Sequence, residues 1–194
     1  VFGEAIKTLA LLMQPFAPHL SEELWHITKH DGFASLQQWP SYDDFKIDKR
    51  AEAVAALVEI TRRDIIEILH LVGVIKPKRI TLFVAEKWKR DFMEILKSEI
   101  KTTRNAGEII KKMMATGLKI YGSEISKLVP RLLSDEAKIP QVVLSQDAEF
   151  HALNDASKDF EEEFKCIVEV MVAENSKEPK ARYAMPGKAA ILVE

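Results

Sequence analysis

Cysteine is nearly absent from this 194-residue chain, which contains Cys166 alone. One cysteine excludes an internal disulfide and every multi-cysteine metal site. Cys166 lies in an apolar run, and we expect it to be a small, buried hydrophobic residue. Glycine is also scarce, with 7 residues scattered along the chain. Neither common type of phosphate-binding glycine loop occurs.

Long apolar runs and catalytic motifs are missing as well. No stretch approaches the roughly 18 apolar residues that a membrane span requires, and no signal-peptide pattern opens the chain, so we predict a cytoplasmic protein without membrane contact. The sequence has no nucleophile-elbow serine and no zinc-protease helix pair. His19, His26 and His30 share one face of a predicted helix, but no carboxylate or thiolate clearly converges on them. We therefore predict no catalytic residue, no metal site and no cofactor in this chain.

The beginning of the chain lacks the usual signals of a helix start. Val1 stands inside an amphipathic pattern, without an initiator methionine or a capping residue before it. This predicts a piece of a longer parent protein.

Two prolines interrupt the helical pattern in the stretch LLMQPFAPHLSEELWHI. Pro15 lacks the N–H that a helix interior needs, so the first helix should end near Gln14. Pro18 suits the first position of the next helix, where the missing N–H costs nothing. The prolines therefore predict a corner between two helices.

Apolar spacing predicts three helices in the first part of the chain, over roughly residues 5–13, 18–29 and 48–74. The second should bury Leu20, Leu24 and Ile27, with Trp25 alongside them. The loop after it contains three large apolar side chains that we expect to pin it to a neighbouring surface: Phe33, Leu36 and Trp39. This pattern predicts that residues 1–74 form part of a helical bundle.

The pattern changes at Gly73, which can end a helix, and Pro77 keeps it ended. A β-rich run, RITLFVA, follows, and helices are then predicted over 87–101, 106–116 and 119–133 and after a Ser145 cap. The segments KCIVEVMVA and AAILVE predict two further strands. The predicted fold is mostly α with a small α+β part, in which residues 75–194 form a domain with a small, about three-stranded mixed sheet.

Charge is distributed unevenly along the chain. The whole sequence has 28 basic and 30 acidic side chains, yet residues 76–131 contain 14 basic and 6 acidic ones, a net charge of +8. This segment could face a polyanion, pair with the acidic segments around it, or form a solvated surface without a partner. Lys76, Lys78 and Arg79 occupy a proline-containing loop at the predicted domain junction, where a phosphate or base could reach them.

The stretch LLMQPFAPHLSEELW resembles the helical anticodon-binding domain of class I aminoacyl-tRNA synthetases of the leucine, isoleucine and valine group. In that subclass a helix ends in a P-x-A-P-H element, and the next helix begins with a small residue, two acids, a leucine and a tryptophan. The residues that match are Pro15, Ala17, Pro18, His19, Ser21, Glu22, Glu23, Leu24 and Trp25. The later SLQQWP resembles the aromatic–proline element that follows. We expect Glu22, Glu23 and Trp25 to act in capping, dipole compensation and packing rather than in RNA contacts.

The segments ITLFVAEKWK and MPGKAAILVE are similar to the C-terminal region of leucyl-tRNA synthetases of the archaeal and eukaryotic cytosolic type. The resemblance covers nearly all 194 residues. It implies a tRNA-binding fragment that contacts the body and long variable arm of tRNA(Leu). The rest of the parent synthetase, with its catalytic and editing domains, would use ATP and Mg²⁺. The catalytic signatures H-I-G-H and K-M-S-K-S do not occur here, so this piece alone is predicted to be inactive.

The resemblance implies that the variable arm is bound at the junction, by Ile75, Lys76, Lys78 and Arg79. We extend the candidate tRNA-binding set along the basic segment, to Lys87, Arg90, Lys111 and Lys112, and expect the basic side chains to gather on one accessible patch. Two alternatives remain open, namely a protein–protein interaction module that meets an acidic partner, and a C-terminal fragment of an isoleucyl- or valyl-type synthetase.

Overall fold

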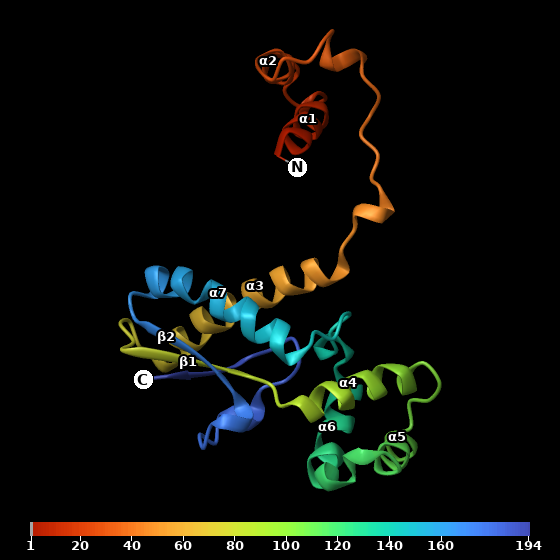
Figure 1. Cartoon of the computed structure of the whole chain (residues 1–194), viewed down its shortest axis with the longest axis vertical. Helices are drawn as coiled ribbons and strands as arrows, with labels where there is room; N and C mark the ends of the chain where they lie inside the picture. Colours follow the sequence, from red (N-terminus) through yellow and green to blue (C-terminus); the bar gives the residue numbers. More distant parts are fainter. Residues whose placement is uncertain (1) are drawn as a thin grey trace. The chain divides into compact units, whose positions relative to one another are not determined.

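The computed structural model describes residues 2–194 and divides into two compact units (Figure 1). The first ends at Ile47, and the second comprises Asp48–Glu194. The sequence placed the division after residue 74 instead. Helix α3 (Lys49–Val72), which the sequence assigned to the first domain, belongs to the second unit, because it packs against helix α7 (Gln146–Phe164).

The first unit consists of two helices and two short 3₁₀ turns, α1 (Phe2–Met13), α2 (Pro18–Ile27), η1 (Ala34–Leu36) and η2 (Asp44–Lys46). Helix α1 ends before Pro15, and Pro18 lies in the first turn of α2. The predicted corner between the two helices is therefore confirmed.

The buried face of α2 differs from the prediction. Leu20 and Ile27 are 56% and 67% exposed, whereas Ser21 and Trp25 are buried. The reason is the position of α1, since the Ser21 hydroxyl donates to the Ala10 carbonyl at 2.6 Å and turns this side of α2 inward. This tertiary hydrogen bond therefore places the polar Ser21 in the buried face of α2, where the apolar spacing predicts Leu20 and Ile27.

Glu22 holds the turn after α2 in place. Its carboxylate accepts the backbone N–H groups of Ala34 at 2.8 Å and Ser35 at 2.9 Å, and the side-chain amide of Gln14 at 2.7 Å. Desolvation opposes its ionisation, but these backbone donors hold the pKa of Glu22 below its usual range. Glu22 therefore has a structural role as the acceptor for the backbone at the start of η1.

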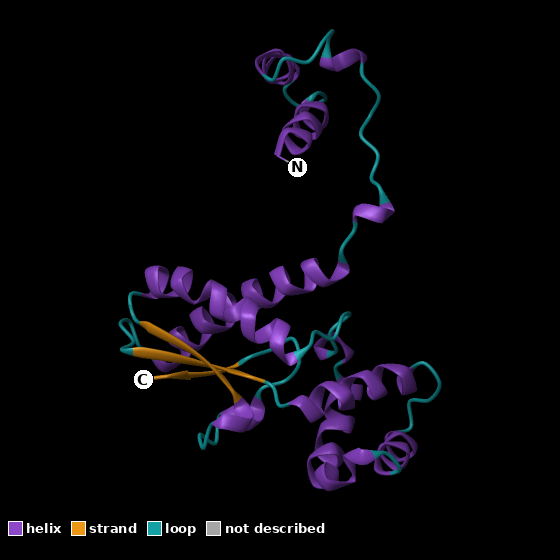
Figure 2. Cartoon of the chain, viewed as in Figure 1, coloured by secondary structure: helices purple, strands orange, loops and turns teal. Residues whose placement is uncertain are grey.

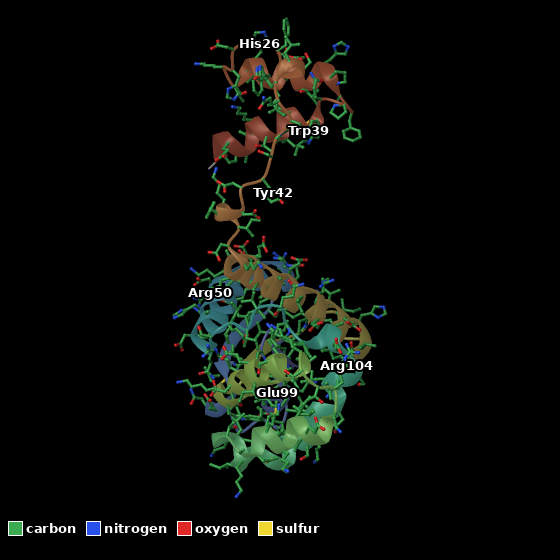
Figure 3. All side chains as sticks on the ribbon, turned by 90° about the vertical axis from the view of Figure 1, so that its right-hand side faces the viewer. His26, Trp39, Tyr42, Arg50, Glu99 and Arg104 are labelled. Atoms are coloured by element: carbon green, nitrogen blue, oxygen red, sulfur yellow. The ribbon has the colours of Figure 1, made fainter. Side chains whose placement is uncertain are left out.

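The loop after α2 leaves its large side chains in solvent. Phe33, Leu36 and Trp39 are 58%, 79% and 62% exposed, so the prediction that they pin the loop is wrong. Figure 3 shows Trp39 and Tyr42 along the connecting segment of this unit.

After α3, the second unit has one strand, then four α-helices, then two strands, which is the order that the sequence predicted (Figure 2). Side chains of Asp48, Asn105 and Ser145 cap the helices that follow them by accepting backbone N–H groups. Besides α3 and α7, its elements are β1 (Arg79–Val84), α4 (Lys87–Ile100), α5 (Ala106–Met114), η3 (Gly117–Tyr121), α6 (Gly122–Ser134), η4 (Glu136–Lys138), β2 (Ile167–Val172), η5 (Ala173–Asn175), η6 (Ala181–Tyr183) and β3 (Ala190–Val193).

The three strands form one mixed sheet in the order β2-β1-β3. Strand β1 pairs with β2 in parallel, from Arg79 opposite Ile167 to Val84 opposite Val172, and with β3 antiparallel. As the central strand, β1 is buried on both faces, which explains its nearly continuous apolar sequence. The predicted fold class, mostly α with a small mixed sheet, is confirmed.

Three apolar clusters hold the second unit together. Helices α3 and α7 cover one sheet face with residues such as Leu57, Ile65 and Phe160, and the segment with η5 and η6 lies against the other face (Figure 1). Helices α4, α5 and α6 form a separate cluster around Phe92 and Met113. Over residues 2–194, no helix is both long and apolar enough to cross a membrane.

Candidate nucleic-acid interface

The junction between α3 and β1 exposes a short segment on a rigid support. Helix α3 ends at Gly73, which adopts a left-handed conformation with φ 71°. Ile75 is 92% exposed, and Lys76 is also exposed, whereas Pro77 between Lys76 and Lys78 is buried. The buried proline anchors the loop so that its neighbours point into solvent.

The last residue of the chain fixes the other half of this junction. The Glu194 carbonyl accepts the N–H of Lys78 at 2.7 Å and that of Arg79 at 3.3 Å, and the Glu194 N–H donates to the Arg79 carbonyl at 2.9 Å. These bonds extend the β1–β3 ladder. The exposed side chains therefore project from a backbone whose conformation is set before any ligand arrives.

Salt bridges distinguish the three cations of the junction. Arg79 Nη1 lies 3.6 Å from Glu169 Oε2 on the neighbouring strand β2. Within the described part of the chain, neither Lys76 nor Lys78 pairs with a carboxylate. Both lysines thus keep their full charge available for phosphate groups, whereas that of Arg79 is partly compensated.

Lys87 and Arg90 lie in the first turns of α4, beyond the other end of β1. Lys87 is exposed, and its backbone N–H donates to Glu174 Oε1 at 2.8 Å. Arg90 is half-buried and pairs with Glu94 at 2.9 Å. Of these two predicted residues, Lys87 is therefore the more accessible cation.

Lys111 and Lys112 lie on the exposed side of α5. Lys112 forms a salt bridge with Glu99, near the C-terminal end of α4. Glu99 follows Lys87 by about three helical turns, or roughly 18 Å. Figure 3 shows Glu99 on α4.

The predicted basic residues do not form one patch. Lys76 and Lys78 precede β1, whereas Lys87 follows it, and a six-residue strand separates the two positions by roughly 20 Å. Lys112 lies toward the far end of α4 from Lys87. The structure thus distributes the candidate residues among three places, and the expectation of a single patch is wrong.

A buried lysine that the sequence did not predict, Lys89, belongs to the first turn of α4. Lys89 is 1% exposed, and its ammonium donates to the carbonyls of Arg182 and of Ala184, the latter at 3.0 Å. Burial lowers the pKa of Lys89, while the charges of Glu86 and Glu124 act to raise it. Lys89 therefore holds the backbone of residues 182–184 in place, and its charge is not available at the surface.

A buried carboxyl group, that of Glu149, binds the same C-terminal segment at Gly187. Glu149, in the first turn of α7, is 4% exposed and accepts the Gly187 N–H at 2.7 Å. Burial raises the pKa of Glu149 to about 7, although the bond from Gly187 acts to lower it. Gly187 has φ 77°, and an added Cβ would lie 3.2 Å from Pro140 Cβ, so this turn requires glycine.

Sequence signals for these two residues existed but were weak. Lys89 precedes Phe92, Met93 and Leu96 by three, four and seven residues, which places it on the apolar face of α4. Nothing local marks Glu149, because its partner is 38 residues away.

Cys166 is only partly buried, and burial raises the pKa of its thiol, with the charge of Glu161 adding to the effect.

The part of the chain that contains the helical corner and the long helix α3 also matches a known family. The family model described as the anticodon-binding domain of tRNA ligase matches residues 1–120. The chain therefore belongs to the family of anticodon-binding domains of tRNA ligases.

Curated relatives match over nearly the whole chain. The leucine–tRNA ligase of Methanosarcina barkeri is 34% identical over 193 residues, which cover 94% of this chain and 20% of the relative. That of Methanocaldococcus jannaschii is 33% identical, covering 100% and 20%, and that of Aeropyrum pernix is 31% identical, covering 97% and 19%. The chain thus spans about a fifth of the length of these relatives.

Proposed function

We propose that this chain is the tRNA-binding C-terminal part of a leucine–tRNA ligase, and that it positions tRNA(Leu) through the tRNA body and its long variable arm. The observation that carries the proposal is the junction, where Lys76 and Lys78 stand unpaired on a backbone fixed by buried Pro77 and by Glu194. Similarity to leucine–tRNA ligases over nearly the whole chain supports the choice of leucine over isoleucine or valine.

The junction has the chemistry that RNA recognition needs. The Lys76 and Lys78 ammonium groups bind phosphates and release counterions, which makes the affinity depend on salt. Ile75, which is 92% exposed, offers an apolar contact to an unstacked base of the arm. Because the supporting backbone is already ordered, little conformational entropy is lost when RNA binds.

The remainder of the proposed ligase supplies the reaction, in the cytoplasm. The catalytic and editing domains belong to that remainder, which uses ATP and Mg²⁺ to join leucine to its tRNA. In the part of this chain that the structure describes, no three His, Cys, Asp or Glu side chains gather around a possible metal position. We assign no ATP-binding or Mg²⁺-binding residue to this chain, and we expect it to be inactive in aminoacylation by itself.

Binding of tRNA to the purified chain tests the proposal. We expect the chain to bind a leucine tRNA with its long variable arm at least about fivefold more tightly than the same tRNA with a shortened arm, because the arm adds one or two charge-assisted contacts. The measurement is the dissociation constant from fluorescence anisotropy of end-labelled tRNA.

Two results would contradict the proposal. Equal affinity for both tRNAs would reduce the junction to generic attraction for polyanions. No tRNA binding at low salt, together with binding of an acidic protein partner, would favour the protein–protein interaction module instead.

A further inference from the structure

A second exposed basic segment lies at the other end of the sheet from the junction. Strands β1 and β2 are parallel, so the chain that precedes Arg79 and the chain that follows Val172 lie at opposite ends of the pair, roughly 20 Å apart. The segment after Val172 contains η5 and η6, and Figure 1 shows it beyond the end of β2, beside the start of α4. We name residues 176–183 the distal loop.

The distal loop presents an aromatic ring to solvent. Tyr183 is 59% exposed, the most exposed of the Phe, Tyr and Trp side chains in residues 48–194. Other aromatic residues of this unit, such as Phe83, Phe92 and Phe160, are fully buried. A single exposed ring is common on protein surfaces, so the backbone and the charges around Tyr183 decide whether it marks a contact.

The backbone on both sides of Tyr183 is fixed from below. The buried ammonium of Lys89 binds the carbonyls of Arg182 and Ala184, which flank Tyr183 in the sequence. Ala181 and Ala184 are 2% and 0% exposed and pack beneath the sheet. A buried lysine without a carboxylate partner is costly, and here it holds the chain so that Arg182 and Tyr183 face outward.

The charges around the ring favour a polyanion. The Arg182 guanidinium lies 5.2 Å from the centre of the Tyr183 ring, and its Nη2 donates to the Tyr183 hydroxyl at 3.3 Å. Lys177 and Lys180 are exposed in the same loop, against one exposed acid, Glu178. An aromatic face beside several cations is the arrangement on which unpaired bases stack while flanking phosphates are neutralised.

We propose that the distal loop is a second RNA contact, in which an unpaired base stacks on Tyr183 and the adjoining phosphates bind Arg182 and Lys180. This inference rests on the proposed tRNA-binding function and adds to it a site for a single-stranded nucleotide. Lys89 acts as a positioning residue, because its contacts are with the loop backbone. The exposed Lys87 lies next to this loop, since its N–H binds Glu174 just before it.

The test compares Tyr183→Ala with Tyr183→Phe in the full chain, using labelled leucine tRNA. Because stacking needs the ring and not the hydroxyl, the Ala variant should bind roughly 5- to 30-fold more weakly, while the Phe variant should stay within about twofold of the wild type. Both variants should unfold at the wild-type temperature, because the side chain is exposed.

The outcomes separate this inference from the proposed function. If the wild type binds the tRNA and Tyr183→Ala binds equally well, the distal loop is not a contact, although the tRNA-binding function stands. If Ala and Phe lower the affinity equally, stacking is refuted. Failure of the wild type itself to bind overturns the proposed function and the second contact with it.

Discussion

Simultaneous replacement of Lys76, Lys78 and Arg79 with alanine is expected to weaken binding of leucine tRNA by roughly 30- to 100-fold, because three charged contacts that are together worth about 2 to 3 kcal/mol are lost. Arg79 contributes least, since Glu169 already compensates part of its charge. The fold should survive, because these side chains are exposed and Pro77 and Glu194 still hold the backbone. The measurement is the dissociation constant for tRNA with the long arm and with a shortened arm.

The matched control replaces Lys101, Lys119 and Lys127, which are exposed and belong to the same basic segment but lie outside the junction. It removes the same charge and should cost about threefold or less, for both tRNAs alike. An equal loss in the two triple variants would show that the junction supplies only non-specific attraction, contrary to the proposed contact with the variable arm.

The buried carboxyl of Glu149 is expected to make the stability of the folded chain fall as the pH rises. Its pKa is raised to about 7 in the folded chain from the ordinary glutamate value of 4.5, which we take for the unfolded chain. Between these two pH values the folded chain binds more protons than the unfolded chain, so stability falls as pH rises. The stabilisation is fully present below about pH 4.5, and a shift of this size corresponds to about 3 kcal/mol lost once the pH exceeds 7.

Glu149→Gln should remove this dependence. The amide oxygen still accepts the Gly187 N–H and carries no charge, so at pH 8 the variant should be more stable than the wild type by about 2 to 3 kcal/mol. Near pH 5 the difference should be small. Urea unfolding at several pH values provides the measurement, with Glu162→Gln on the exposed side of α7 as the control.

If wild type and Glu149→Gln lose stability in parallel between pH 5 and pH 8, burial of this carboxyl does not govern the pH response. A variant that is less stable at every pH would show instead that the ionised carboxylate is the form that holds the Gly187 turn.

Local signals in the sequence predicted the elements of this fold well. Pro15 and Pro18 determine the corner between α1 and α2 through their missing N–H groups, and Ser145 begins α7 by capping it. Strand β1 could be recognised because a central strand buried on both faces is apolar at nearly every position. Each of these features depends on neighbours within a few residues.

Features that depend on distant partners could not be predicted. The inward face of α2 follows from the bond between Ser21 and Ala10, and no periodicity reveals a polar residue chosen in this way. The grouping of the cations depends on how β1 and α4 separate Lys76 from Lys87 in space. Net charge along the chain indicated a basic segment, but only the fold shows that its cations lie apart.

The salt dependence of tRNA binding by the wild-type chain shows whether exposed, unpaired cations of the second unit contact RNA phosphates. The two ends of the sheet offer three to five such contacts, so the logarithm of the association constant should fall against the logarithm of salt concentration with a slope of about −2 to −4. A slope near zero, with affinity unchanged by salt, would show that these cations do not contact RNA phosphates.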